Sequence, residues 1–246
     1  MGFIEGWPPG QAESTESSLT LRFLVDDWSG PATVTFTQHG DELEADVTAD
    51  NEPRALEQAM RVLSLDHDGT GYAELEDPIV RELQRKAGYL RPVLFHSPYE
   101  CAALSILSAR TSRANANRLR DALSPEGAFA TPRQLLELQE LKGLPANKIP
   151  RLHGIAEAAL EGRLDRERLM ALEDPVNDLQ TLPGIGPFYA TLIYVRACGP
   201  TDAPPPQEPR LHEAVQQLYQ RPVEDVAENW RPFRTWVSVL IRATHE

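Results

Sequence analysis

The sequence has few cysteines, and their positions exclude some common kinds of site. Cys101 and Cys198 are far apart, and no histidines stand at ligand spacing, so neither a zinc site nor a metal cluster is indicated. A chain of 246 residues can bury enough apolar surface to fold without a metal or a disulfide. The sequence also lacks an apolar run of 18 residues and a secretory segment, so we expect a soluble, cytoplasmic protein without a membrane partner.

Positive charge is scarce as well. The net charge of -13 argues against a polyanionic ligand, because lysine and arginine provide most of the affinity for one. The acidity is concentrated in residues 1–96, which hold 7 basic and 18 acidic side chains, whereas residues 97–246 hold 17 and 19. Fifteen of those 17 bases are arginines, which suit bidentate phosphate contacts. Any binding to phosphate should therefore be modest and salt-sensitive.

The N-terminal third predicts a small sheet followed by one helix. Residues 1–18 have little to bury and predict a loose arm, although Phe3, Ile4 and Trp7 could dock against the rest. Alternating apolar and polar residues predict antiparallel strands at 19–25, 32–38 and 42–49. An amphipathic helix is predicted at 52–63, with one apolar stripe made of Ala55, Leu56, Ala59, Met60 and Leu63.

The remainder of the chain predicts helices. After a turn at 66–71, helices are expected at 78–88, 98–107, 109–123, 132–140, 147–161, 164–172 and 176–181, with an extended linker at 90–97. In the arginine-bearing helix at 109–123, Arg113, Asn117 and Arg120 share one face. That face is either solvated or turned toward phosphate, and the sequence does not decide between the two.

The stretch from Leu182 to Glu213 carries the clearest local signals. Gly184 and Gly186 predict a tight hairpin with positive φ and outward backbone amides, followed by a helix at 188–197. Such amides at a helix N-terminus favour an anion, and phosphate is the natural one; a helix-helix turn without a ligand is the alternative. A run of three prolines then leads to Glu208 at the start of a helix at 209–219.

This stretch resembles the helix-hairpin-helix and Gly/Pro/Asp superfamily of base-excision DNA glycosylases, most of all the bacterial 3-methyladenine DNA glycosylase II branch. Segments beginning at Tyr99, Gly143 and Ala227 match that branch in the same order. The resemblance implies an α+β, mainly α fold: an arm (1–18), a small sheet-plus-helix domain with linker (19–96), and a two-lobed helical domain (97–246) with its hairpin at 180–187. It also implies that damaged bases are flipped out of double-stranded DNA and their N-glycosidic bonds hydrolysed.

The resemblance assigns roles to residues on both sides of the hairpin. Glu208 stands where the family has its catalytic aspartate, and Asp202 is the second candidate carboxylate. Bifunctional relatives have a Schiff-base lysine where this chain has Phe188, so lyase activity is not expected. Phe188 is either a wall of the base pocket or a core residue. The other positions implied for the pocket are Leu192, Pro209 and Arg242, of which the last two replace a tyrosine and a tryptophan of the branch.

The remaining implied contacts concern DNA and a cation. Gly184, Ile185 and Gly186 would hold a phosphate, and Arg113 would lie at the DNA surface. Ala109 and Arg110 stand at the wedge position, where Arg110 either fills the gap in the duplex or contacts phosphate. Backbone carbonyls of Gln180, Leu182 and Ile185 would hold a monovalent cation, Na⁺ or K⁺, whereas the iron-sulfur loop of some relatives is missing. We expect no required cofactor and a monomer associated with the nucleoid. The rival functions are an inactive protein that binds damaged DNA and a glycosylase for a different lesion.

Overall fold

A computed structural model describes residues 13–15 and 17–245. The predicted docking of Phe3, Ile4 and Trp7 lies outside these residues. The chain forms two compact units: unit 1 contains residues up to Val62 together with Leu94–Cys198, and unit 2 contains Leu63–Val93 together with the chain from Gly199. The predicted boundary between residues 96 and 97 does not coincide with these units, because the segment 63–93 packs with the C-terminal helices.

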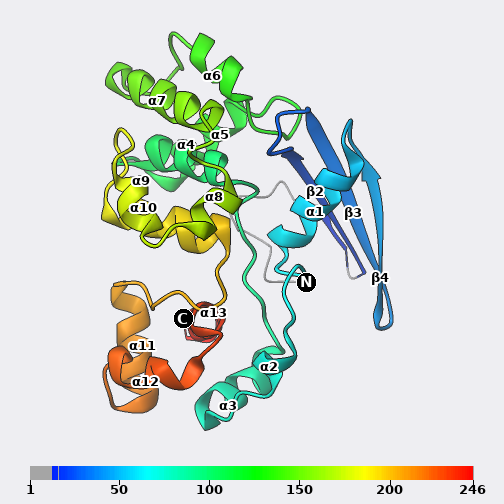
Figure 1. Ribbon diagram of the computed structural model, residues 1–246, viewed down its shortest axis with the longest axis vertical. Helices are drawn as coiled ribbons and strands as arrows, with labels where there is room; N and C mark the ends of the chain where they lie inside the picture. The colour runs from blue at the N-terminus through cyan, green and yellow to red at the C-terminus, as the bar shows by residue number, and fades with distance from the viewer. Residues whose placement is uncertain (1–12, 16, 246) are drawn as a thin grey trace. The chain divides into compact units, whose positions relative to one another are not determined.

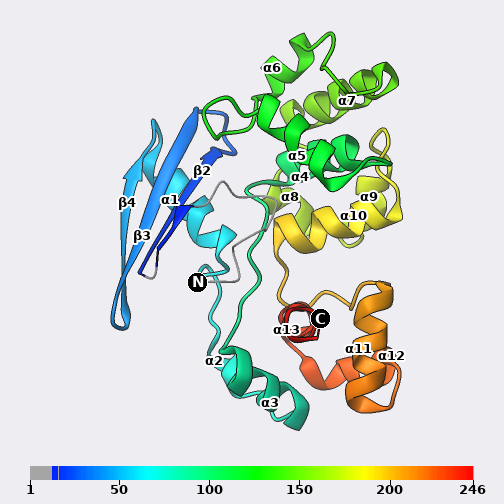
Figure 2. The ribbon, with the colours of Figure 1, turned by 180° about the vertical axis from the view of Figure 1, so that it is seen from behind.

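Unit 1 begins with an antiparallel sheet of strand order β1-β2-β3-β4. The strands are β1 (Glu13–Ser14), β2 (Ser18–Leu24), β3 (Pro31–His39) and β4 (Glu42–Thr48). Strands β2, β3 and β4 were predicted, whereas β1 falls in the part predicted as a loose arm; it forms because Glu13 and Ser14 pair with Thr20 and Leu19. β4 is an edge strand (Figures 1 and 2), and almost all of its residues are exposed.

Helix α1 (Glu52–Val62) packs on the sheet through a face that differs from the predicted stripe. Its buried residues include the polar Gln58 and Arg61, whereas Leu56 and Met60 are only half-buried. The Gln58 amide accepts from the Asp26 backbone amide at 2.9 Å and donates to the carbonyl of His96 at 3.0 Å. The Gln58 side chain therefore links α1 to a segment that precedes it in the sequence and to one that follows it. A pattern of apolar residues does not predict such polar contacts.

The rest of unit 1 is helical. Its elements are α4 (Pro98–Ser108), α5 (Arg113–Ala122), α6 (Pro132–Glu137), η2 (Ala146–Lys148), α7 (Ile149–Leu160), α8 (Arg166–Ala171), α9 (Pro175–Gln180), α10 (Pro187–Ile193) and the short π-helix η3 (Tyr194–Cys198). Almost every residue of α4 is buried, so this helix is the centre of the unit 1 core. Helix α5 was predicted to start at Ala109 but starts at Arg113, because Arg110 has a φ of 55° that no right-handed helix accepts.

Unit 2 contains α2 (Thr70–Ala73), α3 (Pro78–Ala87), α11 (Pro209–Tyr219), α12 (Val223–Val226), η4 (Ala227–Trp230) and α13 (Arg234–Thr244). Helix α2 was not predicted, because its four residues overlap the end of a turn signal. The core of this unit contains Trp230 and Trp236. The Tyr219 hydroxyl donates to the Asp77 carboxylate at 2.9 Å and accepts from the Trp230 indole at 3.1 Å, so α3, α11 and η4 share one polar network.

The predicted fold class, an α+β chain that is mainly helical with a small antiparallel sheet, is confirmed. Within the part that the structure describes, no helix has the length and apolar content needed to cross a membrane.

Candidate functional site

The predicted hairpin forms between α9 and α10 in unit 1. The Leu182 amide donates to the Leu179 carbonyl, and the Ile185 amide donates to the Leu182 carbonyl, both at 3.1 Å. Gly184 has a φ of 83°, and a Cβ there would lie 2.9 Å from side-chain atoms of both Arg151 and Ile106. Only glycine satisfies both the left-handed backbone and this close approach.

Gly186 differs from the prediction that both glycines take positive φ. Its φ is -95° and its ψ is -179°, which is extended backbone that any residue adopts, and it occupies the N-cap position of α10. A Cβ at Gly186 would meet no atom within 4 Å. The space above Gly186 is therefore open to a ligand, whereas the side chains of Arg151 and Ile106 pack against Gly184.

Several backbone amides at the hairpin have no partner. Among the residues that the structure describes, no group accepts a hydrogen bond from the amides of Gly184, Gly186, Phe188 or Tyr189. The amides of Phe188 and Tyr189 belong to the first turn of α10, where the helix dipole places partial positive charge. These donors beside open space can hold an anionic oxygen.

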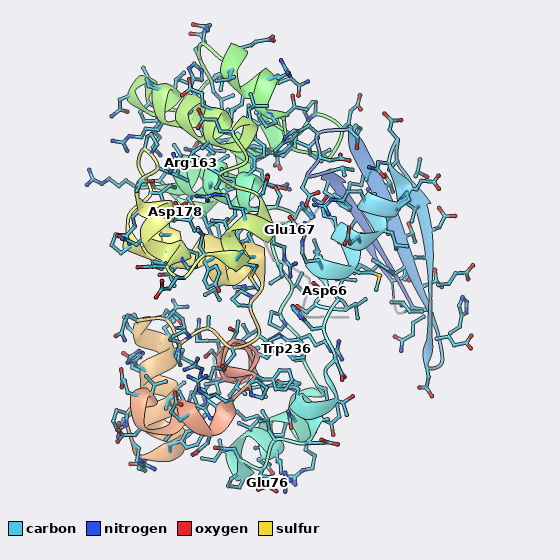
Figure 3. All side chains as sticks on the ribbon, viewed as in Figure 1. Asp66, Glu76, Arg163, Glu167, Asp178 and Trp236 are labelled. Atoms are coloured by element: carbon cyan, nitrogen blue, oxygen red, sulfur yellow. The ribbon has the colours of Figure 1, made fainter. Side chains whose placement is uncertain are left out.

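The hairpin is fixed in place by its neighbours in unit 1. Pro183 packs against α7, where a Cβ on Gly154 would come within 2.8 Å of it. An Arg163 guanidinium nitrogen donates to the Thr181 hydroxyl at 2.6 Å, and Asp178 on α9 accepts two bonds of 3.0 Å from Arg168. Figure 3 labels Arg163 and Asp178, which lie close to this region. The basic side chains near the hairpin were not predicted, because they come from other segments of the chain.

Phe188, the second residue of α10, is exposed. It leaves 67% of its surface open to solvent and makes an edge-on contact with Tyr189, with ring centroids 5.3 Å apart. The interpretation of Phe188 as a core residue is therefore wrong. Leu192, by contrast, is half-buried against the unit 1 core.

The turn after α4 holds Arg110 in an unusual conformation. Ala109 caps the helix, and Arg110 follows with a φ of 55° and an exposed side chain. The Lys148 ammonium donates to the carbonyls of Leu107 at 3.1 Å and Ala109 at 2.7 Å, so a cation satisfies the C-terminus of α4. Burial, together with the nearby Arg151 charge, lowers the pKa of Lys148. Sequence reasoning missed this brace because Lys148 is about 40 residues from the turn.

One face of α5 differs from the prediction. Arg113 and Asn117 are exposed, but Arg120 is buried and forms an ion pair of 2.8 Å with Glu100 on α4. Glu100 also bonds His96 at 2.9 Å. Burial would raise the pKa of Glu100, but the charges of His96 and Arg120 outweigh it and lower this pKa to about 2. Arg120 is therefore not available to phosphate.

The candidate carboxylate, Glu208, belongs to unit 2. It is the N-cap residue of α11 without a side-chain capping bond, and 31% of its side chain is exposed. Its Oε2 lies 2.8 Å from Nε of Arg242, which is in the last turn of α13. The structure thus brings together two predicted site residues that are 34 positions apart. Pro209 is the first residue of α11 and is exposed.

Asp202, the second candidate carboxylate, forms ion pairs with two arginines. It accepts from the guanidinium groups of Arg231 and Arg234 at 2.8 Å each. The Arg234 guanidinium also donates to the Asp202 carbonyl at 2.7 Å. Asp202 therefore braces the loop after unit 1 onto the start of α13, and Glu208 is the carboxylate with fewer fixed partners.

The fold is that of the DNA glycosylases. An 8-oxoguanine glycosylase/lyase from Clostridium acetobutylicum matches with a TM-score of 0.62 at 16% identity, over 98% of this chain and 100% of that one. A 3-methyladenine DNA glycosylase from Schizosaccharomyces pombe, solved with abasic DNA, matches with a TM-score of 0.54 at 22% identity, over 68% of this chain and 90% of that one.

The sequence comparison is more particular. DNA-3-methyladenine glycosylase 2 of Escherichia coli is 31% identical over 140 residues, which are 55% of this chain and 49% of that protein. The chain thus spans about half the length of the curated relative that it matches. No protein-family model matches the chain. The resemblance found in the sequence motifs is confirmed by this homology and by the fold.

Proposed function

We propose that the chain is a monofunctional DNA glycosylase of base-excision repair, which flips damaged bases out of double-stranded DNA and hydrolyses their N-glycosidic bonds. The observation that carries this proposal is the hairpin, where partnerless amides stand at the start of α10 beside open space at Gly186. The homology to DNA-3-methyladenine glycosylase 2 supports it. Alkylated bases are then one class of substrate, and the protein acts as a monomer in the cytoplasm, associated with the nucleoid.

Each candidate residue has a separate task in this proposal. The hairpin amides of Gly184 and Gly186 bind a phosphate, with Ile185 between them. The Arg110 side chain, presented by its left-handed turn, enters the gap left by the extruded base, with Ala109 beside it and Arg113 near the backbone. The exposed ring of Phe188 stacks on the flipped base.

Glu208 is the proposed catalytic residue. As the bond between the sugar and the base breaks, positive charge develops on the sugar, and a nearby carboxylate stabilises it before water is captured. The side chain is partly exposed rather than enclosed, so a ligand can reach it. Because a phenylalanine stands where bifunctional relatives have a lysine, no Schiff base forms and the reaction ends with an abasic site.

We also propose that the hairpin can hold a monovalent cation through the carbonyls of Gln180, Leu182 and Ile185. Among the described residues, the carbonyls of Gln180 and Ile185 accept no hydrogen bond, and that of Leu182 accepts only one. Spare carbonyl lone pairs suit a hard cation. A cation bound there would add positive charge next to the phosphate-binding amides; no other cofactor is required in this proposal.

The second candidate function is an inactive protein that binds damaged DNA. The ion pair between Glu208 and Arg242 favours it, because a carboxylate already paired with a cation stabilises a second positive charge less well. The extra methylene of a glutamate relative to an aspartate adds to this, since misplacement by ~1 Å can cost ~100-fold in rate.

Single-turnover release of bases from methylated duplex DNA tests the proposal, with Glu208→Gln and Glu208→Asp compared to the natural chain. An active glycosylase loses release with Gln and keeps or gains it with Asp. Release from the Asp variant alone would identify an intact scaffold with a weakened carboxylate. If none of the three proteins releases any base from a wider panel of damaged duplexes, the binding function replaces the enzymatic one.

A further inference from the structure

The ion pair of Glu208 and Arg242 bears on which bases the protein can release. Nε of Arg242 lies 2.8 Å from the Glu208 carboxylate. If that carboxylate faces the sugar during the reaction, the guanidinium lies within a few ångströms of the bond that breaks. Any base attached there therefore meets the positive charge of the guanidinium.

Arg242 is also accessible to a ligand. It borders a hollow of about 420 Å³ at the surface of unit 2, whose lining is formed by Arg210, Glu213, Ala214, Gln217, Arg242 and His245. This volume lies in the range of small-molecule sites. Among the described residues nothing bonds the terminal nitrogens of Arg242, so they are free to donate. The hollow presents two arginines against one glutamate.

We infer that Arg242 determines specificity and that the preferred substrates are neutral damaged bases carrying a carbonyl oxygen, rather than cationic alkylated purines. This inference rests on the proposed glycosylase function and narrows its substrate class. A cationic base is repelled by the guanidinium, and an arginine side chain offers no electron-rich ring face that would attract such a base. A neutral base is not repelled by the guanidinium, and it needs a hydrogen-bond donor as it leaves.

The charge that the base carries as it leaves explains why a neutral base needs this donor. When the C1′–N bond breaks, its electron pair stays with the base, and water forms the new bond to C1′ and releases a proton. The departing base takes up this proton if the base was neutral, whereas the proton passes to solvent if the base was cationic. A cationic base becomes neutral as it leaves, and needs no help from a cation. A neutral base becomes anionic before it takes up the proton, so N–H donors from Arg242 to its carbonyl oxygen stabilise the transition state.

The test uses two duplexes, one with hypoxanthine as the neutral base and one with 7-methylguanine as the cationic base. Single-turnover release is measured for the natural protein, Arg242→Gln, Arg242→Lys and Glu208→Gln, and each rate is divided by the spontaneous rate for that base. Arg221→Gln is the matched control, because it removes an exposed arginine of unit 2 outside the hollow. Melting temperatures show whether each variant is folded.

The natural protein should give the larger rate enhancement for hypoxanthine. Arg242→Gln should lower the ratio of the two enhancements by at least about tenfold, Arg242→Lys by less because it keeps the charge, and Arg221→Gln not at all. A ratio that favours 7-methylguanine, or that Arg242→Gln leaves unchanged while Glu208→Gln still abolishes release, would overturn this inference alone. Release of neither base, with release of another base from the wider panel, would also overturn this inference alone. Release of no base from that panel, or release that Glu208→Gln does not affect, would overturn the glycosylase proposal as well.

Discussion

At the residue scale, Glu100 shows how strongly the core of unit 1 depends on charge. Its carboxylate is buried between His96 and Arg120, at 2.9 and 2.8 Å. Removing one member of such a group leaves the others buried without a counter-charge, which typically costs about 3–5 kcal/mol. Arg120 was expected on a face of α5 that is either solvated or turned toward phosphate, and its burial is explained by this partner on α4.

Glu100 therefore predicts a particular pH dependence of stability. The pKa of Glu100 is about 2 in the folded chain, below its ordinary value of 4.5. The stabilisation is thus present above pH ~4.5 and is lost as the pH falls toward 2. Glu100→Gln should lower the melting temperature at pH 7 and flatten its decline between pH 5 and 2, as measured by circular dichroism. Glu224→Gln, which changes an exposed glutamate, should leave both unchanged; equal curves for the two variants would contradict this account.

At the scale of elements, the two glycines of the hairpin have different surroundings, so one serves packing and the other leaves space for a ligand. Gly184 is left-handed and packed against Arg151 and Ile106, whereas Gly186 is extended and open. Requirements of fold and of function therefore fall on different residues of the same turn.

Alanine variants of the two glycines should consequently behave differently. Gly184→Ala should cost more than about 1 kcal/mol of unfolding free energy, since Ala at positive φ is strained and its Cβ meets side chains. Gly186→Ala should lower the unfolding free energy by less than Gly184→Ala does. It should weaken binding to duplex DNA about tenfold, because its methyl group occupies the space above the amides. Denaturant unfolding and fluorescence anisotropy measure the two effects. If Gly186→Ala binds DNA as well as the natural chain does, this hairpin is not a phosphate site.

Local signals predicted most elements, and long-range contacts account for what they missed. Alternation located β2, β3 and β4, and proline with a capping residue located the start of α6, where Thr131 accepts from a backbone amide. The ion pair of Glu208 with Arg242 and the Lys148 brace were not predictable, because each joins residues more than 30 positions apart. Both site residues of that pair had been identified, but only as separate positions in a pattern.

At the scale of the whole molecule, the charge distribution limits how DNA can be bound. Residues 1–96 carry most of the excess negative charge. In the proposed function, the arginines of the later part therefore supply the phosphate contacts. For about three such contacts, raising the salt concentration from 50 to 200 mM should weaken duplex binding ~40-fold. Titrations at several salt concentrations give the slope of log affinity against log salt. A slope near zero would mean that arginine-phosphate contacts contribute little.

The division of the chain into units also affects its synthesis. Residues 63–93 are made early, yet they pack with the segment that starts at Gly199. At about 5–20 residues per second, roughly 150 further residues take on the order of 10–30 s to translate. During that time Tyr72, Val80 and Leu83 leave the ribosome without their partners on α11 and α13. The nascent chain therefore exposes the apolar face of the amphipathic helix α3 for seconds, and a chaperone can bind that face during this interval.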